Sequence, residues 1–172
     1  MSEKKDRILR AARQLFATEG YHKVPTSRVA REAGVSEGLI FRHFGHKKGL
    51  LDALMADTEE QLQRVFREVI AEADPQKVIE KTLRIPFEIS EDEYDFWTLQ
   101  FKLKWDAEYN HSNTDNPIVH KLEKAFDQLQ YSHPAFEARL LYQIIDGIAM
   151  SILRDGQPKE AEYLDFLLRR YQ

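Results

Sequence analysis

Apolar residues in the N-terminal part of the chain recur at helical spacing and are interrupted by glycines. The first group falls at i, i+3, i+4, i+7 and i+8 and comprises Ile8, Ala11, Ala12, Leu15 and Phe16. This spacing is typical of one apolar face of an α-helix, and Gly20 follows it as a stop signal. Two shorter groups, over residues 26–33 and 36–44, end at Gly34 and Gly45. The pattern therefore predicts three helices.

Longer apolar segments fill the rest of the chain and also repeat at helical spacing. They are expected as helices over residues 47–72, 75–86, 92–109, 116–131, 134–155 and 158–172. Four of them have proline at or near the first position, where its missing N–H costs least. No segment alternates apolar and polar residues between turn signals, as a half-buried strand would. The sequence therefore predicts an all-α protein of about nine helices.

The composition is that of a globular chain that can bury a core without disulfides or metal ions to stabilise it. It has 172 residues, of which 42% are hydrophobic and 31% charged, and this length supports a sizeable core. It contains no cysteine, which excludes disulfides, thiolate metal sites and cysteine nucleophiles and fits a reducing compartment. The first residues carry charge throughout and no long apolar run occurs, so neither a signal peptide nor a membrane-spanning helix is expected. We expect a cytoplasmic protein.

Charge is distributed unevenly along the chain. Residues 1–50 hold 11 Lys and Arg against 5 Asp and Glu, whereas residues 51–172 hold 14 against 24. A basic segment joined to an acidic one indicates that the basic part meets a polyanion, although two differently solvated faces would give the same counts. The change in composition predicts two domains, residues 1–50 and 51–172, joined rigidly by the helix that begins at Lys47.

The segment 26–45 has the pattern of a helix-turn-helix, a motif whose second helix enters the major groove of DNA. Gly34 lies between its two helices. Thr26 or Ser27 offers a hydroxyl N-cap to the first helix and Ser36 offers one to the second. Because the basic surplus falls on this same segment, DNA binding is the function that the sequence favours.

The outward face of the second helix carries the chemistry of this motif. With Ile40 and its neighbours turned inward, the outward residues are Glu37, Gly38, Phe41 and Arg42. Gly38 keeps the surface low, so that the helix backbone can approach the groove. Arg42 is suited to a guanine edge or a phosphate, and Phe41 to a thymine methyl group or a sugar.

Two runs in this region resemble a known family. The strings ILRAARQLFATEGYHKVPTSRVAREA and GVSEGLIFRHFGHKKGLL, within about residues 5–52, resemble the N-terminal domain of TetR/AcrR-type bacterial transcriptional repressors. The resemblance implies a three-helix DNA-binding domain followed by a helical effector-binding and dimerisation domain. It also implies contacts with double-stranded operator DNA at the starts of the second and fourth helices and along the third, namely Thr26, Ser27, Arg28, Ser36, Glu37, Gly38, Phe41, Arg42, His43 and Lys47.

The chain differs from the usual TetR/AcrR sequence at two positions. The family has tyrosine where Phe41 stands, so a hydrogen bond to phosphate is lost there and only van der Waals contact remains. His46 replaces a small polar cap, so the sequence leaves open how the fourth helix begins. Neither change disrupts the expected architecture.

An aromatic stripe runs along the helix predicted at 92–109. Its members recur at spacings of three and four residues and include both tryptophans of the chain. Plain core packing would produce such a stripe. By the family resemblance, the stripe and one further ring would instead line a cavity for an apolar or aromatic small-molecule effector, and these residues are Phe87, Tyr94, Trp97, Phe101, Trp105 and Tyr109.

The last two predicted helices carry more apolar surface than one core can cover, which indicates a homodimer. Gly147 and Ser151 are small residues one turn apart and permit close helix approach. The string IIDGIAMSIL also resembles a helix with which the family forms a four-helix bundle across a two-fold axis. The residues expected in the dimer interface are Leu140, Ile144, Gly147, Ile148, Ser151, Leu164, Leu167 and Leu168.

No catalytic motif stands out in the sequence. Glu108-x-x-His111 and His120-x-x-Glu123 have the carboxylate–histidine spacing of di-iron bundles, but solvated surface residues explain both pairs better. We expect no enzyme, no cofactor and no metal site. The predicted function is a DNA-binding regulator, a repressor released from its operator by an effector. The alternatives are a helical small-molecule enzyme or metal protein and a constitutive DNA-binding dimer without an effector.

Overall fold

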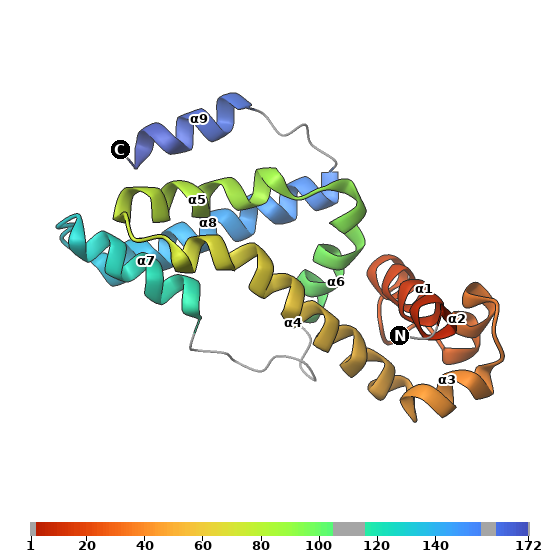
Figure 1. Cartoon of the computed structure of the whole chain (residues 1–172). Helices are drawn as coiled ribbons and strands as arrows, with labels where there is room; N and C mark the ends of the chain where they lie inside the picture. The colour runs from red at the N-terminus through yellow and green to blue at the C-terminus, as the bar shows by residue number, and fades with distance from the viewer. Residues whose placement is uncertain (1–2, 105–115, 156–160, 172) are drawn as a thin grey trace. The chain divides into compact units, whose positions relative to one another are not determined.

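Every regular element of the computed structural model, within the part of the chain it describes, is a helix (Figure 1). Residues 3–104, 116–155 and 161–171 are described, without the side chains of residues 57–64. The α-helices are α1 (Glu3–Glu19), α2 (Thr26–Ala33), α3 (Glu37–Phe44), α4 (Lys47–Ala71), α5 (Pro75–Glu88), α6 (Tyr94–Lys104), α7 (Pro117–Gln128), α8 (Pro134–Asp155) and α9 (Ala161–Arg170), with a 3-10 turn at Glu91–Glu93. The all-α prediction is confirmed.

Contacts divide the chain into two compact units. Unit 1 comprises Met1–Gln61 and Asp92–Asn110, and unit 2 comprises Leu62–Glu91 and His111–Gln172. The division therefore falls within α4 instead of at residue 50, and α6 joins the N-terminal helices. Composition marked residue 50 because the charge balance changes there, whereas packing follows the apolar faces of the helices.

The core of unit 1 is built by α1, α2, α3, α4 and α6 together. Each of these helices contributes fully or almost fully buried apolar side chains, among them Ile8, Phe16, Val29, Ile40, Leu50, Leu54, Leu99 and Leu103. Burying one such side chain contributes about 1.5–3 kcal/mol. Because α6 supplies Leu99 and Leu103 to this shared core, it is part of the same folding unit as the helix-turn-helix.

Unit 2 is organised around α5, which contacts α7, α8 and α9, and α7 in turn packs along α8. The N-caps of α5 and α7 are side chains: Asp74 accepts from two backbone N–H groups and Asn116 accepts from one. Phe126 of α7 contacts the rings of Tyr131 and Tyr171. These contacts tie the end of α9 to the α5–α7 pair.

Several helix ends differ from the prediction. α5 continues through the buried Pro86 to Glu88, because the packing of its apolar face outweighs the roughly 3 kcal/mol cost of an interior proline. α6 begins at Tyr94, after the 3-10 turn, and the expected continuation of this helix lies outside the described residues. Ser36 is the N-cap residue of α3, as predicted, although its hydroxyl makes no cap hydrogen bond. The N-cap residue of α2 is Pro25, so the predicted hydroxyl cap at Thr26 or Ser27 was wrong.

Candidate nucleic-acid interface

The turn between α2 and α3 is fixed by backbone conformation and by a side chain of α1. Gly34 ends α2 in the left-handed region at φ 62°, where glycine is favoured. Arg7 Nε donates to the carbonyl of Ala33 at 3.0 Å, and Arg7 Nη2 donates to the carbonyl of Gly34 at 2.9 Å. A Cβ atom at Gly34 would lie 2.7 Å from Arg7 Nη2. The first helix therefore clamps the turn, and the left-handed conformation favours glycine at its centre.

The outward face of α3 is accessible along its length. Ile40 is fully buried and anchors the helix, whereas Gly38, Phe41, Arg42 and His43 are exposed. Phe41 leaves 45% of its surface exposed, a large apolar area without a partner in the fold. A Cβ atom at Gly38 would meet nothing within 4 Å, so packing within the chain does not require glycine there. The low surface at Gly38 is thus available to a partner.

Three predicted DNA contacts of α2 and α3 form hydrogen bonds or ion pairs with other side chains of the protein. Arg28 forms an ion pair of 2.7 Å with Glu19 of α1. Thr26 and Glu37, both expected at the DNA surface, bond to each other at 2.6 Å between Oγ1 and Oε1. Their neighbours Ser27 and Ser36 are exposed. The predicted set therefore separates into exposed residues and residues that the fold itself orients.

Lys47 at the start of α4 is held by the loop that joins α1 and α2. Its ammonium group lies 4.5 Å from the centroid of the Tyr21 ring and donates to the carbonyl of His22 at 3.3 Å. Partial burial lowers the pKa of Lys47 below its usual range. An ammonium group has three donors, so the bond to His22 leaves donors for another acceptor.

His46, the departure noted in the sequence, caps α4 with its ring. His46 Nδ1 accepts from the backbone N–H of Gly49 at 2.9 Å, which satisfies one of the free donors of a helix N-terminus. Gly49 is required for close packing, because a Cβ atom there would lie 2.0 Å from the carbonyl oxygen of Phe44. A histidine thus caps this helix at the position where the resembled family usually has a small polar residue.

Only part of the predicted effector pocket can be located. Trp97 is 7% exposed, and its buried indole N–H has no hydrogen-bond partner. Tyr94 and Phe101 on the same helix are half-buried, while Trp105 and Tyr109 lie outside the described residues. Phe87 belongs to unit 2, where its ring meets that of Tyr163 edge-on at 6.1 Å. The stripe on α6 belongs to unit 1.

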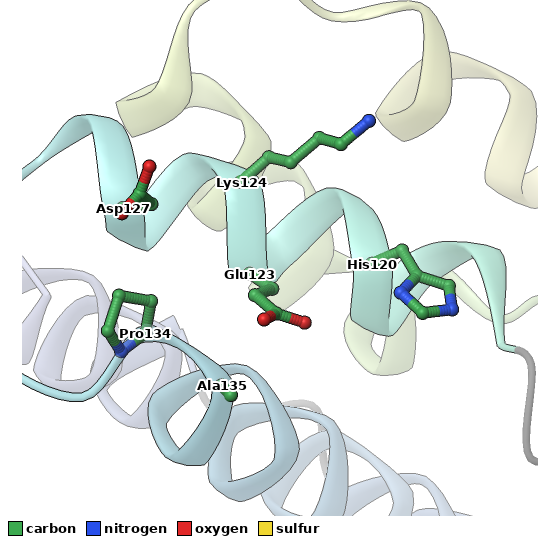
Figure 2. A pocket seen from close by; sticks show the side chains of 6 residues that line it. All are labelled: His120, Glu123, Lys124, Asp127, Pro134 and Ala135. Atoms are coloured by element: carbon green, nitrogen blue, oxygen red, sulfur yellow. The ribbon is translucent and has the colours of Figure 1, made fainter.

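An open groove of about 690 Å³ runs between α7 and α8 (Figure 2). Figure 2 shows Glu123 on the side of α7 that faces α8, with Lys124 pointing away from α8. The lining residues are His120, Glu123, Lys124, Asp127, Pro134 and Ala135. None of these side chains is buried, and the described residues hold no group of three side chains that could bind a metal ion. Glu108 and His111, the other pair with the carboxylate–histidine spacing of di-iron bundles, lie outside the described residues.

Large apolar side chains are exposed on α8 and α9. They are Phe136, Leu140, Met150, Tyr163 and Phe166, between 44% and 68% exposed. Gly147 is also exposed, and Ile144, Ser151, Leu164 and Leu168 are partly so. Ile148 and Leu167, predicted to face a second subunit, are instead 7% and 5% exposed in the core of their own chain. Ile148 directly follows the exposed Gly147, and Leu167 directly follows the exposed Phe166. Neighbouring positions on a helix point to different sides, so these two side chains turn inward.

Comparison with known proteins identifies the chain. Residues 8–54 match the family described as "Bacterial regulatory proteins, tetR family", and this range holds most of α1, all of α2 and α3, and the start of α4. Residues 8–54 form a DNA-binding domain of the TetR family. The chain is a DNA-binding transcriptional regulator.

Relatives match over nearly the whole chain. The HTH-type transcriptional regulator BetI of Proteus mirabilis is 27% identical over 99% of this chain and 94% of its own length. A transcriptional regulator of Saccharomonospora viridis, crystallised with choline, covers 99% of this chain and 94% of its own at a TM-score of 0.73 and 22% identity. FadR of Bacillus subtilis, crystallised with stearoyl-CoA, covers 96% of each chain at a TM-score of 0.72 and 16% identity. Both structures share the fold of this chain.

Sequence reasoning missed the residues that orient this TetR-type interface from a distance. Arg7 lies 26 residues from its acceptor Ala33, and Tyr21 supports Lys47 from the preceding loop. Lys102 of α6 donates to the carbonyls of Ala17 and Thr18 at the end of α1. No local pattern marks these contacts, because each joins segments that only the folded core brings together.

Among the described residues, none of the helices combines the length and the apolar character that crossing a membrane requires.

The clamp on the turn leads to a testable prediction. Replacing Arg7 by Met removes a charged donor from the carbonyls of Ala33 and Gly34, and we expect the free energy of unfolding to fall by about 1–3 kcal/mol. Arg10→Met is the matched control, because Arg10 is exposed on the same helix. Urea denaturation followed by circular dichroism measures both variants. An equal, small effect of the two substitutions would show that the clamp does not stabilise the turn.

Proposed function

We propose that this protein is a cytoplasmic repressor that binds its operator as a homodimer and leaves it when a small-molecule effector binds. The observation that carries the DNA part is the exposed outward face of α3, with open space above Gly38, in a segment that matches the TetR family. In a dimer, two such helices about 34 Å apart meet successive major grooves on one face of B-DNA. Each remaining part of the proposal rests on its own contacts.

The exposed residues of α3 are proposed to read bases, and the residues around them to hold phosphates. Gly38, Phe41, Arg42 and His43 face outward from the helix that would enter the groove. Arg42 has donors for guanine O6 and N7 or for a phosphate. Ser27, Arg28 and Lys47 stand at helix starts, where backbone N–H groups and the helix dipole favour an anion. The ion pair to Glu19 and the ring of Tyr21 hold Arg28 and Lys47 in place.

Dimerisation is proposed through the exposed faces of α8 and α9. On α8, Phe136, Leu140, Gly147 and Met150 are exposed at spacings of four, seven and three residues, the repeat of a helix seam that meets a partner helix. Monomeric proteins rarely expose apolar side chains of this size in such a row. Partly exposed residues complete the proposed interface, namely Ile144, Ser151, Leu164 and Leu168, whereas Ile148 and Leu167 support it from the core.

The effector is proposed to act through α6. Its residues Leu99 and Leu103 belong to the core that includes the DNA-binding helices, and Lys102 bonds to the end of α1. A ligand that contacts the aromatic residues of α6 therefore acts on a helix already attached to the DNA-binding unit. Such a ligand shifts the equilibrium only by the difference in its affinity for the bound and released states.

The chemistry of α6 favours an apolar or aromatic effector, or a cation that aromatic rings can hold. The rings of Tyr94, Trp97 and Phe101 offer apolar area, and their faces attract quaternary ammonium groups. Among proteins of the same fold, one was crystallised with choline and another with stearoyl-CoA. These two compounds are therefore the first probes, since one tests cation–π binding and the other tests acyl-chain binding.

Two variants test the DNA contacts. Lys47→Ala should weaken binding to all duplexes similarly and flatten the salt dependence, because a phosphate contact carries no base information. Arg42→Ala should cost roughly 1–3 kcal/mol and relax selectivity at one operator position. Fluorescence anisotropy at two salt concentrations, with duplexes selected from a random library and with unselected duplexes, measures both effects. Equal affinity of the wild type and both variants for every duplex would overturn the proposed interface.

Tryptophan fluorescence tests the effector site. In a Trp105→Phe background, Trp97 is the remaining tryptophan, and choline or stearoyl-CoA should change its emission if the proposal holds. Phe101→Ala should weaken that response while leaving duplex affinity largely intact. If the stripe is only core, Phe101→Ala should cost roughly 3–5 kcal/mol of stability and neither probe should alter the emission. That result would leave a dimeric DNA-binding protein without an effector at α6.

Charged substitutions test the dimer. Leu140→Glu or Phe166→Glu should convert the dimer into monomers, because an unpaired carboxylate would be buried at the interface. Ile70→Glu is the control, since Ile70 is a comparably exposed apolar residue, 46%, on α4. Sedimentation velocity gives the oligomeric state of each variant. A monomeric wild type, or dimers in all variants, would contradict the proposed faces.

A further inference from the structure

Two residues expected to face DNA are bonded to each other across the helix-turn-helix. The Thr26 hydroxyl donates to Glu37 Oε1 at 2.6 Å, and each residue is the first of its helix, α2 or α3. Both side chains are half-buried. The bond therefore fixes a carboxylate at the N-terminal end of the helix that presents Gly38, Phe41 and Arg42 outward.

A carboxylate at this place opposes the attraction that brings the basic unit to DNA. Phosphate groups repel it, and the interaction weakens as salt screens it. The fold supplies only a modest reason for the charge, because an acidic group in the first turn of an exposed helix stabilises it by about 0.3–1 kcal/mol. A neutral acceptor would take the Thr26 hydroxyl equally well. The negative charge itself is the feature that requires explanation.

A carboxylate held in this way selects for hydrogen-bond donors. An ionised carboxylate accepts hydrogen bonds and donates none. Oε1 takes the Thr26 hydroxyl, and Oε2 remains for a second donor. In the major groove the amino groups of cytosine and adenine are donors, whereas guanine N7 and O6 and thymine O4 are acceptors. Residues near the N-terminus of a recognition helix reach base edges.

We propose that Glu37 is a specificity-determining residue, and that Thr26 positions its carboxylate. Glu37 accepts a hydrogen bond from the amino group of a cytosine or adenine in the operator. On DNA that offers no such donor at that place, the carboxylate stays unpaired beside phosphates and lowers affinity. Glu37 therefore separates operator from other DNA mainly by weakening binding to the latter. This inference rests on the proposed placement of α3 in the major groove.

The test compares variants that separate charge from shape. Glu37→Gln keeps the length of the side chain and an acceptor for Thr26 but removes the charge, and Thr26→Val removes the positioning hydroxyl but keeps the charge. Glu88→Gln is the control for net charge, because Glu88 is exposed at the end of α5 in unit 2. Each full-length protein is measured against unselected duplexes and against duplexes that wild type selects from a random library.

Glu37→Gln should bind unselected duplexes about fivefold more tightly at low salt, and the gain should shrink as salt rises. Its preference for the selected duplex over unselected DNA should fall roughly tenfold, and its own selection should lose a cytosine or adenine position. Thr26→Val should weaken that same base preference without the salt-dependent gain on unselected duplexes that Glu37→Gln shows. Glu88→Gln should behave as wild type.

Different failures have different meanings. If Glu37→Gln weakens binding to every duplex equally and lowers the melting temperature, Glu37 only stabilises the start of α3 and the inference is wrong. The inference is equally wrong if Glu37→Gln binds unselected duplexes as wild type does. If instead wild type binds no duplex at all, the proposed function fails first, whatever the variants do.

Discussion

The arrangement of the DNA-binding unit depends on how the turn between α2 and α3 is held. Gly34 supplies the left-handed backbone, and the guanidinium of Arg7 donates to the carbonyls of Ala33 and Gly34. These two residues lie far apart in the sequence, so the turn takes its shape only once α1 has packed. The direction of α3, and with it every proposed base contact, follows from that packing.

Contacts with other side chains of the protein orient the charged and polar groups of this unit, and net charge alone does not. Arg28 is paired with Glu19, Lys47 rests on the ring of Tyr21, and Thr26 bonds to Glu37. Each partner reduces the number of conformations that the charged or polar group can adopt. Groups ordered before binding lose less entropy when DNA arrives. The basic surplus of the first fifty residues therefore explains attraction to a polyanion, whereas these pairs explain orientation.

The position of α6 connects the two proposed activities physically. Leu99 and Leu103 share one core with the helix-turn-helix, and Lys102 bonds to the end of α1. The same helix carries the buried, unpartnered indole N–H of Trp97. The helix that shares the DNA-binding core is therefore also the one on which the effector is proposed to act.

The sequence by itself determined the local features of this protein. The spacing of apolar residues located the helices to within a few residues, and Gly34 and Gly45 located the ends of α2 and α3. The residue pattern over 26–44 located the DNA-binding motif. These features depend on neighbours along one helix, which a periodic pattern records. Only the tertiary structure decided that α6 joins the N-terminal unit, that Arg7 clamps Gly34, and that Ile148 and Leu167 face inward. Such contacts join distant segments, and a side chain's choice between core and surface then depends on which helix packs against it.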